Sequence, residues 1–314
     1  MKQYGGNVMD LNLVRDIING NETTIDLYFT EKTTDGYCSQ VADIANDRNG
    51  INVLDFIKGL VLTTVNDLIN QNNEIVDYNP TGIADGTLEI TDYDYVNNRE
   101  EVLESFELAD GEQLEENADN LNFYTLVFQN GTDVVRIMRR VSKFKRLYSK
   151  GLIVGFRGNQ INRIDSKMIG MDGSIDLIDF NNQILILNHV ALERIFNLQE
   201  KFENTARNTL NKLRNNANIA NFDAFEEDCL GDKRIQRILT KMSSEDIDWE
   251  HCLEQFENVV DIINTFELNI DYHRVPVDQI VYEDKLQMMD FVRLVRDAYY
   301  RTMINNRTGI TSKI

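Results

Sequence analysis

The lysines and arginines between residues 134 and 168 are the side chains whose type and spacing best suit a binding chemistry. Ten basic residues lie there against one acid, Asp165, although the 314-residue chain carries a formal net charge of -20. Because this segment contributes +9, the rest of the chain carries -29. Like charges repel one another, so packing stability gives no reason to gather them. The pattern predicts a surface for a polyanion such as nucleic acid.

Most of these basic residues are expected to contact DNA. The predicted contacts are Arg136, Arg139, Arg140, Lys143, Lys145, Arg146, Lys150, Arg157 and Arg163. The segment contains no helix-turn-helix or other base-reading module, so binding should rest on phosphate contacts and select sequence only weakly. A smaller C-terminal set would extend this surface and comprises Arg293, Arg296, Arg301, Arg307 and Lys313.

Catalytic chemistry has weak support in the sequence. No HExxH, Cys/His quartet, phosphate-binding loop or GxSxG occurs, so no catalytic residue, metal or cofactor is predicted. One nuclease-like group, Asp278, Glu283 and Lys285, has the residue types that hold Mg²⁺ and position water. Its carboxylates are only five residues apart, without the strand separation usual in such sites. Whether the chain is an enzyme stays open, and a non-catalytic role is favoured.

Alternating apolar and polar residues predict a mostly antiparallel sheet ahead of Asn188. Tight hairpins are expected at Asn130-Gly131 and Asn181-Asn182, because these residues tolerate positive φ. Asp176 and Asp179 would face opposite sides of a strand, so they could share a metal only across a bulge. Predicted strands cover residues 23–32, 37–44, 123–128, 134–141, 152–156, 174–180 and 183–187. Predicted helices cover residues 52–70, 190–215, 233–241, 245–268 and 284–304.

The basic segment itself fits two interpretations. Apolar residues recur at three- and four-residue spacing from Val134 to Tyr148, which is typical of a helix. The Asn-Gly pair ahead and the β-branched start favour a strand that continues as a loop. In a strand, Arg139 and Arg140 would point to opposite faces.

Strands followed by a run of helices indicate an α+β fold. We expect an antiparallel β-meander core, a mainly helical C-terminal half and a smaller N-terminal α+β region. Residues 85–119 hold thirteen acids and one base, which predicts a solvated acidic face or connector. A segment that docks on the basic residues is the alternative. The predicted domains are residues 1–118, which end in this acidic stretch, and residues 119–314.

Composition predicts a cytoplasmic protein. Three well-separated cysteines without a CxxC pair are expected to be reduced thiols. The most apolar stretch, residues 50–69, is interrupted by polar residues and predicts an amphipathic helix instead of a membrane span. The first residues show no apolar signal-peptide core. Any membrane association should therefore come through a partner.

A family resemblance lies between Ile175 and Phe196, in the run IDLIDFNNQILILNHVALERIF. This run resembles the hallmark segment of the KwaB family of bacterial Kiwa anti-phage defence. That segment joins an apolar-Asp-Phe strand, a polar turn, a strand ending in Asn and a helix opening with Glu and Phe. The matching residues here are Asp179, Phe180, Asn181, Asn182, Asn188, Glu193 and Phe196. The basic run VVRIMRRVSKFKRL is also similar, and the resemblance is specific over residues 122–205.

The resemblance implies a cytoplasmic DNA-binding effector that engages phage DNA and blocks its replication or transcription. It also implies a small transmembrane partner protein, KwaA-like, that detects infection and recruits the chain to the inner face of the membrane. Self-association as a homodimer or higher oligomer is expected. The resemblance assigns no DNA contact residue by residue, so the contacts named above rest on charge alone. A metal-dependent nuclease of phage defence is the alternative function.

Overall fold

A computed structural model describes residues 9–44, 52–82, 85–110, 118–143, 154–157, 160–163, 169–245, 247–249 and 253–311. The chain divides into two compact units: unit 1 spans residues 1–78 and 83–198, and unit 2 spans residues 79–82 and 199–314. The predicted α+β fold class is confirmed. The predicted boundary between residues 118 and 119 lies inside unit 1, whose sheet takes strands from both sides of it.

Unit 1 is built on one sheet of eight strands. They are β1 (Thr24–Thr33), β2 (Gly36–Val41), β3 (Glu74–Asp77), β4 (Thr87–Asp92), β5 (Phe123–Asn130), β6 (Asp133–Arg140), β11 (Leu177–Phe180) and β12 (Gln183–Ile186). Their spatial order is β2-β1-β5-β6-β11-β12-β4-β3, and every pair is antiparallel except β3 with β4. Two short pairs lie outside this sheet: β7 (Ser142–Lys143) with β10 (Ile169–Gly170), and β8 (Val154–Arg157) with β9 (Gln160–Arg163).

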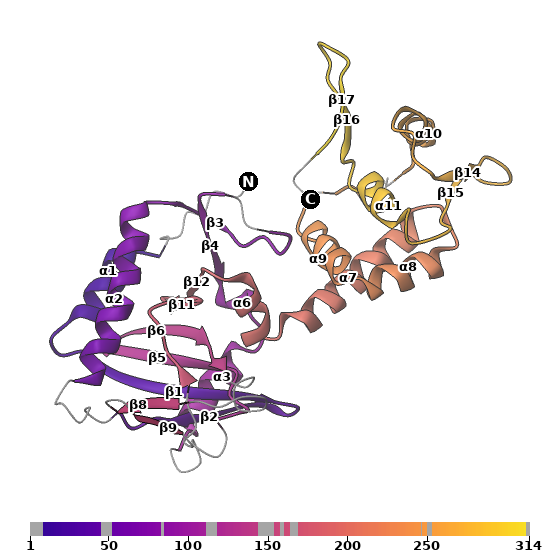
Figure 1. The fold of residues 1–314 in the computed structure, drawn as a ribbon. Helices are drawn as coiled ribbons and strands as arrows, with labels where there is room; N and C mark the ends of the chain where they lie inside the picture. Colours follow the sequence, from indigo (N-terminus) through magenta and orange to yellow (C-terminus); the bar gives the residue numbers. More distant parts are fainter. Residues whose placement is uncertain are drawn as a thin grey trace. The chain divides into compact units, whose positions relative to one another are not determined.

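Helices cover both faces of this sheet (Figure 1). On one face, α1 (Leu11–Asn19) and α2 (Val53–Gln71) pack in a single apolar core with strand residues such as Leu126, Phe128 and Ile137. On the other face lie α3 (Arg99–Glu107) and α6 (His189–Ile195). Hydrogen bonds between Ser105 and Ser39 and between His189 and Glu89 fix these two helices to the strands. Both faces are therefore buried, so inward polar side chains need partners.

The two predicted hairpins form, and one turn is shifted by a residue. Asn181 and Asn182 both have positive φ, 50° and 63°, and connect β11 to β12 as predicted. In the β5–β6 hairpin Asn130 pairs with Asp133, so the turn residues are Gly131 and Thr132 instead of Asn130 and Gly131. Gly131 supplies the positive φ of 61° that this turn requires. Because β6 runs to Arg140, the helical alternative for the start of the basic segment is wrong.

The acidic stretch contributes structure to unit 1. Its residues form β4, a turn of 3-10 helix (Tyr93–Tyr95) and α3. Glu89 on β4 is buried and hydrogen-bonded to His189 at 2.5 Å. Arg99, the one base of the stretch, is buried as well. Glu89 and Arg99 therefore pair within the fold, whereas Glu100, Glu101, Glu104 and Glu107 are exposed, which agrees with the predicted solvated acidic face.

Unit 2 is mainly helical, as predicted for the C-terminal half. Its helices are α7 (Leu198–Asn216), α8 (Phe222–Gly231), α9 (Lys233–Met242), α10 (Phe256–Thr265) and α11 (Met288–Val295). Short strands accompany them: β13 (Ile219–Ala220), β14 (Asp271–His273) and β15 (Gln279–Val281) form one sheet, and β16 (Tyr299–Arg301) pairs with β17 (Thr308–Ile310). Phe225, Tyr282 and Phe291 pack ring against ring in the core, with centroids 5.1 to 5.6 Å apart.

Two predicted helices end earlier than their apolar spacing indicated. The helix expected over residues 190–215 is split into α6 and α7 by Asn197, whose φ is 55°. The helix expected over residues 284–304 stops at Val295, because Asp297 takes a φ of 52° and the Ala298 N–H bonds back to the Arg293 carbonyl. The chain then returns as the β16–β17 hairpin. No helix in the described part of the chain is long and apolar enough to span a membrane.

Candidate anion-binding site

A basic pocket of about 490 Å³ opens on unit 1 at the ends of β1 and β6. Its described lining includes four cations and no acid: Lys32, Arg139, Arg140 and Arg194. Asn122, Phe123, Val141 and Ile195 complete the described lining. In a chain whose net charge is -20, this convergence of positive charge marks the pocket as a candidate site for an anion.

Strand register explains why residues far apart in sequence meet here. Thr30 on β1 pairs with Phe123 on β5, and Phe123 pairs with Arg140 on β6. Because side chains alternate along a strand, Lys32 lies on the same face as Thr30. That face is the one that carries α6, whose last turn holds Arg194. The sheet and one helix therefore bring three cations to one place.

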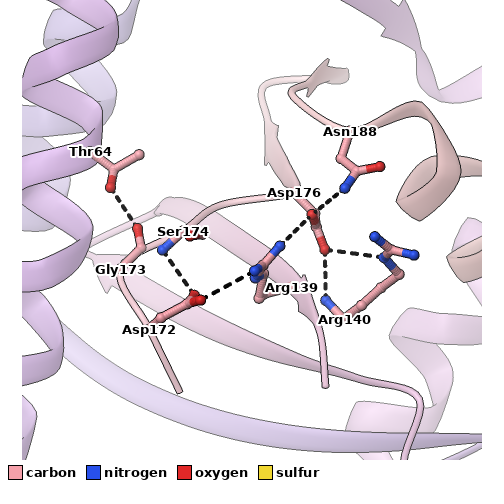
Figure 2. Close-up of polar contacts among 8 residues, drawn as sticks. All are labelled: Thr64, Arg139, Arg140, Asp172, Gly173, Ser174, Asp176 and Asn188. Carbon is pink, nitrogen blue, oxygen red and sulfur yellow. Dashed lines mark hydrogen bonds and ion pairs between the residues drawn. The ribbon is translucent and has the colours of Figure 1, made fainter. Parts of the chain in front are cut away.

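A buried carboxylate, Asp176, organises the arginine side of the pocket (Figure 2). Its side chain is 1% exposed. It accepts hydrogen bonds from Arg139 Nη1 at 2.8 Å, from the backbone N–H of Arg140 at 2.8 Å and from Asn188 Nδ2 at 2.9 Å. Arg140 Nε lies 3.6 Å from Asp176 Oδ2. The alternation predicted for Arg139 and Arg140 holds, yet both reach one carboxylate because it lies beside the end of their strand.

The loop ahead of β11 adds a second carboxylate (Figure 2). Asp172 accepts from Arg139 Nη2 at 3.3 Å and from the Ser174 backbone N–H at 3.1 Å. Thr64 of α2 donates to the Gly173 carbonyl at 2.5 Å, which ties this loop to the helix. Burial disfavours the ionised forms of Asp172 and Arg139, but the ion pairs of Arg139 with Asp172 and Asp176 outweigh this cost. The pKa of Asp172 is therefore lowered and that of Arg139 is raised. Arg139 is therefore held ionised and in place.

Arg140 and Arg194 make fewer side-chain hydrogen bonds than Arg139 does. Among the described residues, the terminal amino groups of Arg140 and the guanidinium of Arg194 donate no hydrogen bond. The described lining therefore holds four basic side chains, of which Arg139 is paired with Asp172 and Asp176 and Arg140 lies beside Asp176. An anion that enters the pocket would meet the Arg194 guanidinium and the terminal amino groups of Arg140.

The family comparison covers most of this site. A family model described as Kiwa protein KwaB-like matches residues 118–305, which is more than half of the chain. The chain belongs to this family. The matched range contains Arg139, Arg140, Asp176 and Arg194, but not Lys32. Comparison with curated proteins and with solved structures gave no match. Kiwa is an anti-phage defence system, so this KwaB-like chain is a component of such a system.

The predicted DNA contacts fall into three groups in this KwaB-like fold. Arg139 and Arg140 lie together at the pocket, whereas Arg136 points to Asp179, with 3.6 Å between Nη1 and Oδ1. Three others have described backbone only, in the short strands β7, β8 and β9: Lys143, Arg157 and Arg163. Three lie outside the described residues: Lys145, Arg146 and Lys150.

Sequence reasoning missed Lys32 and Arg194. Each is a single basic residue within a mixed stretch, so local charge density gives no signal for either. Their place at the pocket follows from long-range pairing of β1 with β5 and from the packing of α6. Clustering of charge in the sequence therefore identifies only some of the cations at the pocket, because Lys32 and Arg194 reach it through the fold.

Arg136 belongs to a second buried network, centred on Asp179. This carboxylate is fully buried and accepts from Arg99 Nε at 2.8 Å and from Tyr93 Oη at 2.5 Å. The Arg99 guanidinium lies over the Tyr93 ring, 3.3 Å from its centroid. Burial raises the pKa of Tyr93, and the negative charge of Asp179 raises it further. With its carboxylate occupied by arginines, Asp179 serves the fold of unit 1.

The other candidate groups also have internal partners. Lys285 Nζ lies 3.2 Å from Asp228, and in the described part of the chain no group of three His, Cys, Asp or Glu residues could hold a metal ion. Arg296 of the C-terminal basic set is hydrogen-bonded through Nε to Glu245 at 2.6 Å. Arg293 and Arg301 are likewise paired, with Asp290 and Asp261. Much of the second basic patch is therefore neutralised within unit 2.

Proposed function

We propose that this chain engages phage DNA through phosphate contacts at the basic pocket and along the basic segment that follows β6. Bound in this way, it would block replication or transcription of the phage DNA. The observation that carries the proposal is the gathering of Lys32, Arg139, Arg140 and Arg194 at one pocket whose described lining holds no acid. Arginine guanidinium groups match phosphate oxygens in geometry as well as charge.

Electrostatics favour this surface over the rest of the protein. The remaining chain is strongly acidic and repels nucleic acid, so an approaching duplex is directed toward the basic face. Phosphate contacts carry no sequence information, which suits a defence protein that meets many phage genomes. The family assignment supports a role in defence, and the charge supports DNA as the ligand.

The proposal includes the expected partners. The chain would act with a small transmembrane partner protein, KwaA-like, that recruits it to the inner face of the membrane. It would assemble as a homodimer or higher oligomer. Support comes from membership of the Kiwa family together with the lack of a membrane-crossing helix in the described residues.

Salt-dependent binding to closed circular duplex DNA tests the proposal. If four to six cations contact phosphates, log K should fall with log salt at a slope of about -4 to -5. Replacing Arg140 and Arg194 by Ala should reduce that slope by about 2, because each lost contact removes about 0.9. A matched variant changes Lys233 and Arg234, exposed residues of α9 in unit 2, and should leave the slope unchanged.

Two results would oppose the proposal. If the Arg140 and Arg194 variant folds normally and keeps the wild-type slope, the pocket makes no phosphate contact. If Mg²⁺ leads to nicking of the same plasmid, the alternative function of metal-dependent nuclease gains support. No described metal-ligand cluster favours that alternative.

A further inference from the structure

We infer that the β16–β17 hairpin of unit 2 is a docking element for a second copy of this chain. Its tip, Met303 and Ile304, enters a groove on unit 2 of the second copy, lined by α10 and the end of α11. The inference deepens the self-association that is part of the proposed function, and it rests on that part. It does not depend on the basic pocket or on DNA.

The turn of the hairpin carries the most exposed large apolar side chains in the described part of the chain. Met303 and Ile304 are 102% and 94% exposed. Figure 1 shows the hairpin projecting from the helices of unit 2. Single exposed apolar residues are common on protein surfaces, but these two are adjacent at the end of a projecting element. Their burial on another molecule would remove apolar area from water and stabilise a complex.

The hairpin is ordered by its own contacts. The Thr302 N–H donates to the Arg307 carbonyl at 2.8 Å, and the Arg307 N–H donates to Thr302 Oγ1 at 2.9 Å. Tyr300 pairs with Gly309 across the two strands, and its ring lies so close that a Cβ on Gly309 would be 2.6 Å from it. A loop that is ordered before it binds loses less conformational entropy on association.

A groove of about 510 Å³ on the same unit has side chains that suit this tip. Val259, Leu294 and Val295 line it and are only 5% to 6% exposed. Exposed polar residues also line it, among them Gln255, Asn258 and Asp297. Buried apolar residues with polar residues around them are typical of the surfaces at which proteins bind one another. The groove therefore suits an apolar anchor that a second protein supplies.

Charge on the hairpin complements charge at the groove. The described lining of the groove holds two acids, Asp248 and Asp297, and one cation, Arg296. Arg296 is already hydrogen-bonded to Glu245. Beside the tip, Arg307 is exposed, and its guanidinium has no partner among the described residues. An arginine that arrives with the apolar tip can therefore meet the exposed carboxylate of Asp297.

A second copy is the occupant that this chain itself supplies. Tip and groove belong to the same unit, so two copies related by a two-fold axis can make the contact twice. Within one chain Met303 and Ile304 stay exposed, so the hairpin does not fill the groove of its own unit. Each copy thus carries both halves of the contact.

Sedimentation velocity of the full chain over a range of concentrations tests the inference. Wild type should self-associate, and replacing Met303 and Ile304 by Ser should raise the dissociation constant about a hundredfold, because two apolar side chains lose their burial. The matched control replaces Val275 and Val277 by Ser. These two are also exposed apolar residues of unit 2, at 84% and 53%, and their change should leave the dissociation constant unaltered.

Photo-cross-linking locates the contact. With benzoylphenylalanine in place of Ile304, irradiation should give a covalent dimer on a denaturing gel. Mass spectrometry of its peptides should place the link in α10 or at the end of α11. A link to unit 1, or to another part of unit 2, would overturn the inference.

The outcomes separate this inference from the proposed function. A wild-type monomer would overturn both the proposed self-association and the inference. Self-association that is equally strong in the Met303 and Ile304 variant would overturn the inference alone. Sedimentation of wild type, but not of that variant, with vesicles of phosphatidylethanolamine and phosphatidylglycerol would also overturn it, since lipid would then be the occupant of the tip.

Discussion

Replacing Asp176 by Asn tests whether this carboxylate holds the arginine side of the pocket. Two of its donors, Arg139 Nη1 and Asn188 Nδ2, bond Oδ1, and the third, the Arg140 N–H, bonds Oδ2. An asparagine keeps one oxygen and turns the other position into a donor. In either orientation its NH₂ group must face at least one N–H group, so at least one bond is lost.

The expected loss of unfolding free energy is about 3 kcal/mol. A hydrogen bond to a charged group contributes about 1.5 to 3 kcal/mol, and removing one partner of a buried ion pair costs about 3 to 5 kcal/mol. The lower part of that range applies, because Arg139 is 19% exposed and keeps Asp172. For a unit of this size, the melting temperature should fall by about 6 to 12 °C.

Urea unfolding followed by circular dichroism measures the loss. Trp249, the single tryptophan, lies in unit 2, so its fluorescence follows that unit separately. Asp172→Asn is the matched control, since Asp172 is 56% exposed and its change should cost less than about 1 kcal/mol. A loss at Asp176 below about 1 kcal/mol, or no larger than the loss at Asp172, would refute the reasoning.

The control has its own pH signature. The pKa of Asp172 is lowered in the folded protein, so its contribution is complete above the unfolded pKa of about 3.9 and is lost as pH falls through the folded pKa. The difference between wild type and Asp172→Asn should therefore be constant near neutral pH. It should shrink only below about pH 4.

Two further predictions concern buried groups of the two units. Asp179→Asn should cost about 3 to 5 kcal/mol in urea unfolding, because Arg99 would lose its fully buried partner, and a cost under about 1 kcal/mol would contradict this. Cys229 is buried and its pKa is raised by that burial, so a thiol reagent should label it only on unfolding, whereas the exposed Cys38 should react in the native state. Peptide mapping by mass spectrometry distinguishes the two, and rapid native labelling of Cys229 would show that its core is open.

Local signals predicted the elements of unit 1 well. Asn181, Asn182 and Gly131 specify tight turns through positive φ, which depends on the residues themselves and little on their surroundings. Helix ends were harder to predict. Asn197 and Asp297 adopt left-handed conformations in the middle of runs with helical apolar spacing. Tertiary packing decides such positions, and one residue suffices to end the helix.

The candidate site was predictable only in part, because charge clustering does not show which charges are already paired. Arg136 and Arg139 have the same local sequence character as the other basic residues of the segment, yet both are paired with buried carboxylates. For those carboxylates, Asp176 and Asp179, the sequence indicated only that they could share a metal across a bulge. Their burial follows from the position of β11 in the middle of the eight-stranded sheet, which no local pattern specifies.

The effect of Asp176→Asn on anion binding separates positioning from plain electrostatics. Removing a negative charge next to a basic pocket should, by Coulomb attraction alone, strengthen the binding of any phosphate. If Asp176 acts by holding Arg139 and Arg140 in place, the substitution should instead weaken the binding of phosphate. A buried ion pair is often no more stabilising than an apolar replacement of similar volume, so stability alone gives little reason for this arrangement. Tighter phosphate binding by a folded Asp176→Asn protein would show that Asp176 only limits the charge of the pocket and does not position its arginines.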